Sequence, residues 1–156
     1  MKKATIGLTL GFCFLAGTAC LAADAHMGSW KLNEAKSKHT PGTGKNILVV
    51  YEDAMGGKVK ITTHGVIHGT GKPKHTEWTG KFDGKDYSVS GDPRSDTRSY
   101  RKVDDRTLEV TAKKGGKVTF TGRVVVAADG KSRTVTVSGT DEKGKKFKNI
   151  AVFDKQ

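Results

Sequence analysis

The sequence predicts an all-β protein, an antiparallel up-and-down meander of about eight to ten strands that closes into a barrel. Three observations support this prediction. Short runs rich in Val, Ile, Thr, Tyr and Phe recur from Asn46 to the end of the chain, and these residues favour strands. Most runs end at Gly or Asp-Gly, which is typical of hairpin turns. No segment that follows the N-terminal apolar run keeps a helical period, so a parallel α/β fold is disfavoured.

The first 25 residues predict an export signal. Lys2 and Lys3 form a positive start and residues 6–19 are largely apolar, as in secretory signals. This run is about 14 residues long, shorter than the ~20 that cross a bilayer. We therefore expect a signal peptide over residues 1–25, one domain over residues 26–156, and a periplasmic or secreted protein. Cleavage is expected after Ala22, Ala23 or Ala25.

Both cysteines, Cys13 and Cys20, lie inside the predicted signal. Cleavage after the signal removes them, so we expect neither a disulfide nor a thiolate site in the mature chain. An alternative is a lipoprotein that is cut just before Cys20 and anchored through it, because small residues precede this cysteine.

The chain is strongly basic, with a formal net charge of +12. A basic surface attracts anions such as lipopolysaccharide, phospholipid head groups, nucleic acid or an acidic protein. It also favours solubility. The lysines are scattered through predicted turns and form no single-sign block, so we expect no specific nucleic-acid partner.

Taken in order, the elements begin with a strand at residues 28–32. Residues 33–38 are expected to form one or two helical turns with Asn33 as the N-cap, ended by Pro41 and Gly42. Residues 40–45 lack the spacing of a phosphate-binding loop. The remaining strands are expected at 46–52, 58–64, 74–82, 85–90, 96–103, 107–113, 117–128, 132–140 and 146–154.

Alternation along these strands assigns each side chain to a face, because successive residues point to opposite sides of a sheet. One face is apolar and the other carries Lys, Thr, Glu and Ser, which fits a sheet closed around a core. The expected interior residues are Val59, Ile61, Trp78, Phe82, Leu108, Val110, Val118, Phe120, Val124, Val126, Val135 and Val137.

The motif Gly28-Ser29-Trp30, placed ahead of an all-β meander, resembles that of the lipocalin and fatty-acid-binding (calycin) superfamily. More closely, the chain is similar to small secreted bacterial lipocalin-like proteins of unassigned function. The resemblance implies that Trp30 closes one end of the barrel, commonly under an arginine from the last strands. Here the terminal strand carries Lys148 and Ala151 instead. The long helix of lipocalins and the helical lid of fatty-acid binders are also missing, which makes the chain a divergent relative.

The same resemblance implies binding of a small molecule, although fold alone does not fix function. Arg98 and Tyr100 lie two apart on one strand face and can both donate hydrogen bonds to an anion. Arg133 shares the parity of the interior residues and is a second candidate cation. The alternative is that both arginines sit at the barrel rims and reach water along their aliphatic stems.

Aromatic side chains are the candidates for contact with an apolar ligand. They either line a pocket or fill the core, because a barrel of about eight strands is at the size where both outcomes occur. The aromatic candidates are Trp78, Phe82, Tyr100 and Phe120.

The histidines do not predict a metal site. His64 and His68 are four apart, so on a strand their side chains share a face but stand roughly 13 Å apart. Alternation points His64 and His75 toward solvent. The chain also has no nucleophile elbow and no zinc-protease motif. We therefore expect no metal, no cofactor and no enzymatic activity.

The sequence thus predicts an exported, monomeric barrel that binds or carries a small apolar or amphipathic, and optionally anionic, ligand. The alternative is a packed barrel without a ligand that acts through its basic surface on an anionic envelope component. Salt discriminates between the two, because surface binding collapses as ionic strength rises.

Overall fold

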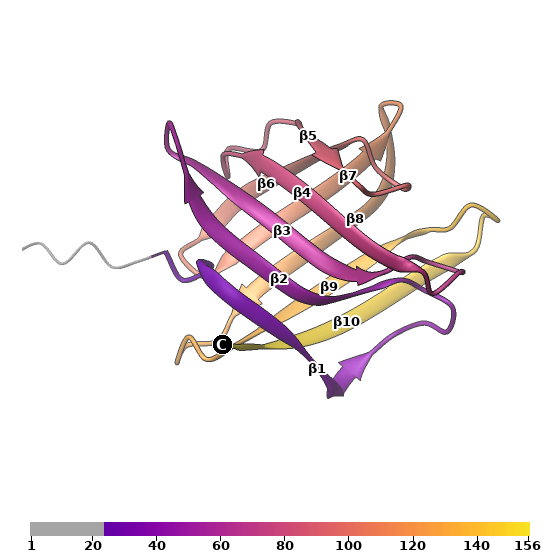
Figure 1. Ribbon diagram of the computed structural model, residues 1–156, viewed down its shortest axis with the longest axis horizontal. Coiled ribbons are helices and arrows are strands. Elements are labelled where there is room, and N and C mark those ends of the chain that lie inside the picture. The colour runs from indigo at the N-terminus through magenta and orange to yellow at the C-terminus, as the bar shows by residue number, and fades with distance from the viewer. Residues whose placement is uncertain (1–23) are drawn as a thin grey trace, which may run out of the picture.

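The computed structural model describes residues 24–156, which form a closed barrel of antiparallel strands (Figure 1). Each strand pairs with its neighbours in the chain, and the first pairs with the last. The predicted all-β meander is therefore confirmed. The strands are β1 (Gly28–Lys38), β2 (Lys45–Ala54), β3 (Lys58–Val66), β4 (Pro73–Gly80), β5 (Tyr87–Ser90), β6 (Thr97–Asp104), β7 (Thr107–Lys114), β8 (Lys117–Val126), β9 (Ser132–Thr140) and β10 (Lys146–Lys155).

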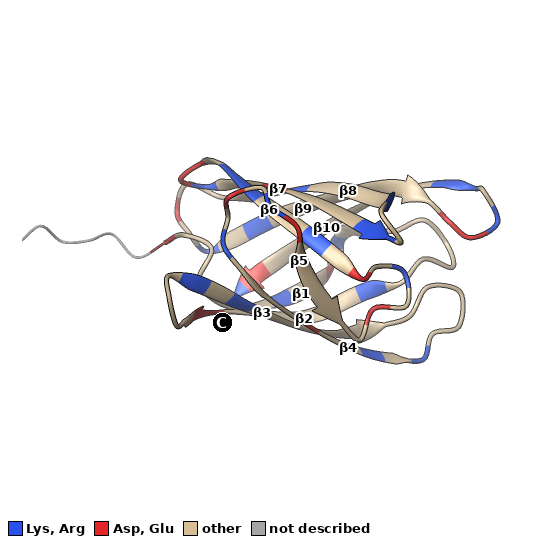
Figure 2. Cartoon of the chain, turned by 90° about the horizontal axis from the view of Figure 1, so that it is seen from above, with Lys and Arg blue, Asp and Glu red and all other residues tan. Residues whose placement is uncertain are grey.

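The predicted export signal falls almost entirely on residues 1–23, which lie outside the described residues, as do Cys13 and Cys20. Within residues 24–156, no helix is long and apolar enough to cross a membrane. Lys and Arg residues lie on strands around the barrel and in the loops at its ends (Figure 2).

The helical turns predicted for residues 33–38 are wrong, because these residues belong to β1. Asn33 does make the hydrogen bond expected of an N-cap, since its side chain accepts from the amide of Lys36 at 3.2 Å. It stabilises an irregularity in the β1–β10 register between Asn33 and Lys38 rather than a helix. Pairing with β10 closes the barrel, and this long-range contact overrides the local preference.

The interior predicted by alternation is confirmed for most positions, including Ile61, Trp78, Leu108 and Val126, which are buried. Val118 is the exception, with 57% of its surface exposed. The β7–β8 register shifts by one residue beside it, so that Ala112 pairs with Phe120 and Lys113 with Val118. A bulge of this kind inverts the alternation, and Val118 therefore faces solvent.

One end of the barrel is filled by Trp30, which is fully buried. Its indole Nε1 donates a hydrogen bond to the carbonyl of His26 at 2.9 Å. The guanidinium of Arg133 lies 4.7 Å from the ring centroid of Trp30, and the ammonium of Lys155 lies 5.1 Å from it. Residues that precede β1 and residues of the last two strands thus pack together at this end.

β5 is the shortest strand of the barrel and has the fewest register pairs with its neighbours. It joins β4 through Ser90 and Val89 and joins β6 through Tyr87 and Ser88, two register pairs on each side. Gly91 follows at φ +76°, a left-handed conformation that favours glycine. This turn carries the chain into the loop that bounds the cavity described next.

Candidate functional site

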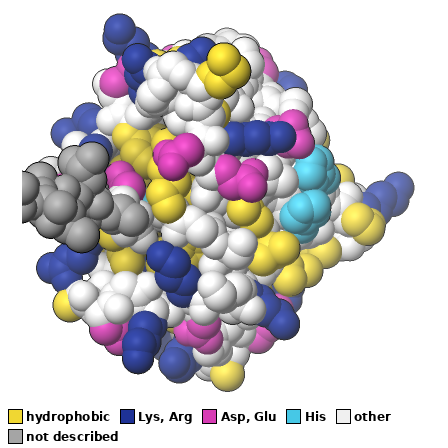
Figure 3. All heavy atoms as spheres, turned by 60° about the vertical axis from the view of Figure 1, so that its left-hand side comes forward, with side chains coloured by type: hydrophobic (Ala, Val, Ile, Leu, Met, Phe, Trp, Pro, Cys, Tyr) yellow, Lys and Arg dark blue, Asp and Glu magenta, His cyan; other side chains and the backbone are white. Residues whose placement is uncertain are grey.

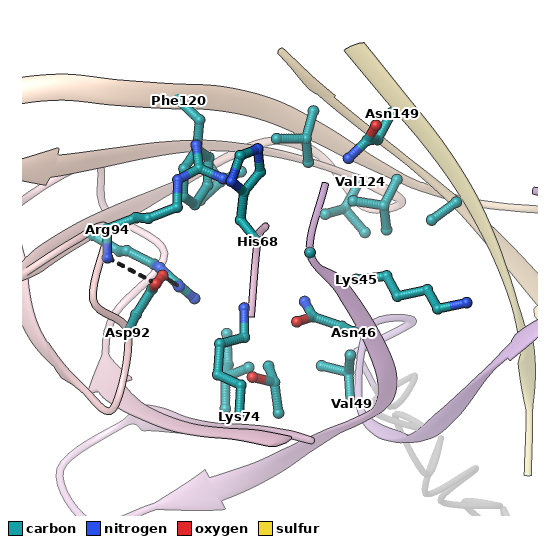
Figure 4. Close-up of a pocket in the computed structure, with 18 of the residues that line it drawn as sticks. Lys45, Asn46, Val49, His68, Lys74, Asp92, Arg94, Phe120, Val124 and Asn149 are labelled. Atoms are coloured by element: carbon teal, nitrogen blue, oxygen red, sulfur yellow. Dashed lines mark hydrogen bonds and ion pairs between the residues drawn. The ribbon is translucent and has the colours of Figure 1, made fainter. Parts of the chain in front are cut away.

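The barrel encloses a cavity of about 140 Å³ that extends from the Trp30 end toward the opposite loops. Its inner wall is mostly aromatic and aliphatic, with Tyr51, Ile61, Val110 and Phe153 among the lining side chains. Its outer end is bounded by residues of the loops that connect β1 to β2, β3 to β4 and β5 to β6. Figure 4 shows His68, Asp92 and Arg94 from two of these loops. The apolar interior therefore leads to a loop-lined opening.

Three cationic side chains lie at the outer part of this cavity: Lys74, Arg94 and Arg98. Lys74 lies on β4 with the same parity as Thr76 and Trp78, both of which are buried, so the strand directs its side chain inward. The guanidinium of Arg94 lies 4.7 Å from the ring centroid of Phe147 and 5.5 Å from that of Phe120. Figure 4 shows Lys45 across the opening with its ammonium pointing away.

Asp92 is the one carboxylate that lines the cavity within residues 24–156. It forms a buried ion pair with Arg98. It also accepts hydrogen bonds from the Ser95 hydroxyl at 2.9 Å and from the amide of Arg94 at 3.1 Å. These bonds fix the loop between β5 and β6 and hold Arg94 beside the opening.

The pKa values of Lys74, Arg94 and Asp92 are shifted by burial and by the neighbouring charges. Burial lowers the pKa of Lys74, and the charges of Arg98 and Arg94 lower it further, against the opposing effect of Asp92. Burial likewise lowers the pKa of Arg94. For Asp92, burial acts to raise the pKa, but the charges of Arg98 and Lys74 together with the hydrogen bonds from Arg94 and Ser95 lower it overall. The cluster carries more positive than negative charge.

At the inner end, Arg133 is only 2% exposed and has no carboxylate partner among the described residues. Its guanidinium lies 4.6 Å from the ring centroid of Tyr51 and 5.3 Å from that of Phe153. Its Nε and Nη1 atoms have no hydrogen-bond partner in the described part of the chain. Burial lowers the pKa of Arg133 and raises that of Tyr51 to about 12, so the phenol stays neutral.

The structure brings together four of the six side chains that the sequence proposed as ligand contacts: Arg98, Tyr100, Phe120 and Arg133 all line the cavity. Trp78 and Phe82 do not. The Trp78 indole donates to the carbonyl of Arg98 at 3.0 Å and packs at 4.6 Å against Tyr100. Phe82 stacks on Trp78 at 6.4 Å, so these two rings form core rather than cavity wall.

Sequence reasoning missed Lys74, Asp92 and Arg94. Parity with Trp78 was a usable signal for Lys74, because an inward-facing lysine on a core strand is unusual. Asp92 and Arg94 lie in a turn, where alternation assigns no face. His68 was also missed; it is half-buried in the β3–β4 loop and lines the cavity.

No protein-family model matches this chain, and a comparison with curated proteins finds no similar sequence. The functional argument therefore rests on the cavity. A chamber with a mostly apolar inner wall, guanidinium groups at both ends and an ammonium group at the outer end can bury a hydrocarbon body and donate hydrogen bonds to an anion.

Proposed function

We propose that this protein binds a small molecule with an apolar body and an anionic group inside its barrel. The observation that carries the proposal is the excess of cations along a cavity whose inner wall is mostly aromatic and aliphatic. Lys74, Arg94 and Arg98 share one carboxylate, that of Asp92. A bound anion supplies the missing negative charge and accepts charge-assisted hydrogen bonds, which are stronger than neutral ones.

The cavity sets the size of the ligand. An apolar cavity of about 150 Å³ accepts a molecule the size of benzene, and the cavity here is about 140 Å³. Tyr100, Phe120 and Phe147 provide aromatic surface beside the cations. Small aromatic or short-chain carboxylates therefore suit both the volume and the charge of this site.

The barrel and its packing at Trp30 support a lipocalin-like relationship. In the superfamily that the sequence resembles, an arginine from the last strands commonly covers the tryptophan of the Gly-x-Trp motif. The terminal strand lacks one, but Arg133 on β9 lies over Trp30. With the predicted export signal, this supports a periplasmic or secreted carrier rather than a packed barrel that acts only through its basic surface.

The direct test is calorimetric titration with benzoate, benzyl alcohol and benzylamine, which share one ring and differ in charge. We expect benzoate to bind, benzyl alcohol to bind about tenfold more weakly because it lacks the charge-assisted bonds, and benzylamine to show no binding. Native mass spectrometry of protein from its own host then identifies copurified anions of similar size.

Two neutralising variants locate the site. Lys74→Gln and Arg94→Gln should each weaken benzoate binding about tenfold. Arg101→Gln is the control, because Arg101 has an exposed side chain outside the cavity. Equal binding of benzoate and benzylamine, or equal loss in all three variants, contradicts the proposal. Binding that collapses with moderate salt points instead to the basic exterior.

A further inference from the structure

His64 and His75 form a directly paired couple on the outer face of the barrel. They are register partners in the β3–β4 ladder, which runs without a bulge from Val59–Gly80 to Val66–Pro73. Both are exposed, and their ring centroids lie 4.6 Å apart. The rings are thus placed by two well-paired strands rather than by a loop. On the face shown in Figure 3, histidine side chains lie together beside acidic and basic groups.

The two imidazoles point the same type of atom at each other. Nδ1 of His64 and Nδ1 of His75 lie 3.3 Å apart. Zinc binds histidine nitrogen at about 2.0–2.1 Å in tetrahedral geometry, which separates two such ligands by about 3.3–3.4 Å. A square-planar ion with similar bond lengths requires only about 2.9 Å between neighbouring ligands. The observed separation therefore fits the spacing of two ligands on a tetrahedral ion better than that on a square-planar one.

A third group orients one of the rings. Nε2 of His75 lies 3.3 Å from Oε1 of Glu77, two residues along β4. Histidines that bind a metal through one nitrogen commonly donate the other N–H to a carboxylate, which fixes the tautomer and makes the ligating nitrogen more basic.

We propose that His64 and His75 bind a zinc ion through their Nδ1 atoms, with Glu77 as a positioning residue behind His75. Residues 24–156 hold no group of three or more potential ligands, so in this proposal the described residues supply two ligands and water fills the other two tetrahedral positions. Lys60, whose ammonium lies 3.3 Å from Glu77 Oε1, balances the carboxylate rather than the metal. This site is separate from the barrel cavity and does not depend on the proposed function.

The test is a zinc titration of the untagged chain by calorimetry, combined with NMR spectra of the imidazole nitrogens. We expect one zinc ion per chain and zinc-dependent shifts of Nδ1 in both His64 and His75. His64→Gln and His75→Gln should each weaken binding about tenfold or more, and Glu77→Gln about tenfold. Magnesium, which prefers oxygen ligands, should not bind here.

His68→Gln is the matched control, because His68 lies in the β3–β4 loop outside this pair and should leave zinc affinity unchanged. Thermal unfolding without metal checks that each variant is folded. The proposal is overturned if His64→Gln and His75→Gln bind zinc as tightly as His68→Gln. It is also overturned if the Nδ1 signals stay fixed at saturating zinc, which would leave only a hydrogen bond between the rings.

Discussion

The guanidinium of Arg133 on β9 lies 4.7 Å from the ring centroid of Trp30 on β1, although β10 separates the two strands. The register explains this reach, because Phe153 of β10 pairs with Arg133 on one side and with Leu32 on the other. A buried charge without a carboxylate is thus held by aromatic faces, which attract cations through their quadrupoles.

This arrangement predicts different changes in stability for two substitutions of Arg133. Arg133→Met removes the buried charge and retains most of the side-chain length, so the free energy of unfolding should stay within about 1 kcal/mol of the wild type. Arg133→Lys keeps a charge but loses the planar group that stacks on Trp30, and should destabilise by about 1–3 kcal/mol. Urea unfolding measures both. A lysine variant as stable as the methionine variant contradicts the stacking account.

The ion pair between Asp92 and Arg98 should be sensitive to loss of one partner. Asp92→Asn leaves the buried Arg98 guanidinium uncompensated and weakens the loop that Ser95 helps to hold, so we expect destabilisation by about 3 kcal/mol. The double variant Asp92→Asn with Arg98→Met should recover part of this loss, because no lone charge is then buried. Additive losses in chemical denaturation would show that the two residues act independently.

Substitution of Gly91 by alanine should destabilise the protein through a steric clash beside the same loop. Its φ is +76°, and a Cβ there would lie 1.9 Å from the carbonyl oxygen of His75. Gly116 has a similar φ of +79° but open space around it. We expect Gly116→Ala to destabilise by about 1 kcal/mol through backbone strain alone, and Gly91→Ala by at least about 2 kcal/mol more. Similar unfolding midpoints for the two variants would refute the crowding.

His26 should make stability depend on pH. Burial lowers its pKa from 6.5 to about 4 in the folded chain, so between these values the unfolded state binds a proton that the folded state excludes. The free energy of unfolding should therefore fall by about 2–3 kcal/mol as pH drops from 6.5 toward 4. His26→Leu should flatten this part of the profile in urea titrations at several pH values.

Most of the fold could be predicted from the sequence, because strands with one dry face and glycine-marked turns leave few alternatives to a closed sheet. The errors fall where a register irregularity interrupts the period of two. Asn33 carries a genuine capping signal that serves an irregular strand, and Val118 is turned outward by the shift beside Ala112. Periodicity contains no information about where such a shift occurs.

The site was predicted only in part for a related reason. Arg98, Tyr100 and Arg133 lie on regular strands, so their parity directs them inward as expected. Asp92 and Arg94 reach the cavity from a turn, and their positions depend on a buried ion pair and aromatic contacts between distant segments. The pairing of His64 with His75 likewise depends on the β3–β4 register, which the spacing of histidines along the chain does not give.

The small number of register pairs at β5 has a consequence for local opening of the barrel wall. Two register pairs on each side of β5 contrast with nine between β9 and β10, so local opening should require least free energy there. Amides of Ser88 and Val89 should then exchange with solvent hydrogen before those of the other strands. Opening of this lateral seam would expose the barrel interior between β4 and β6 to solvent, at a rate set by local unfolding of one short strand.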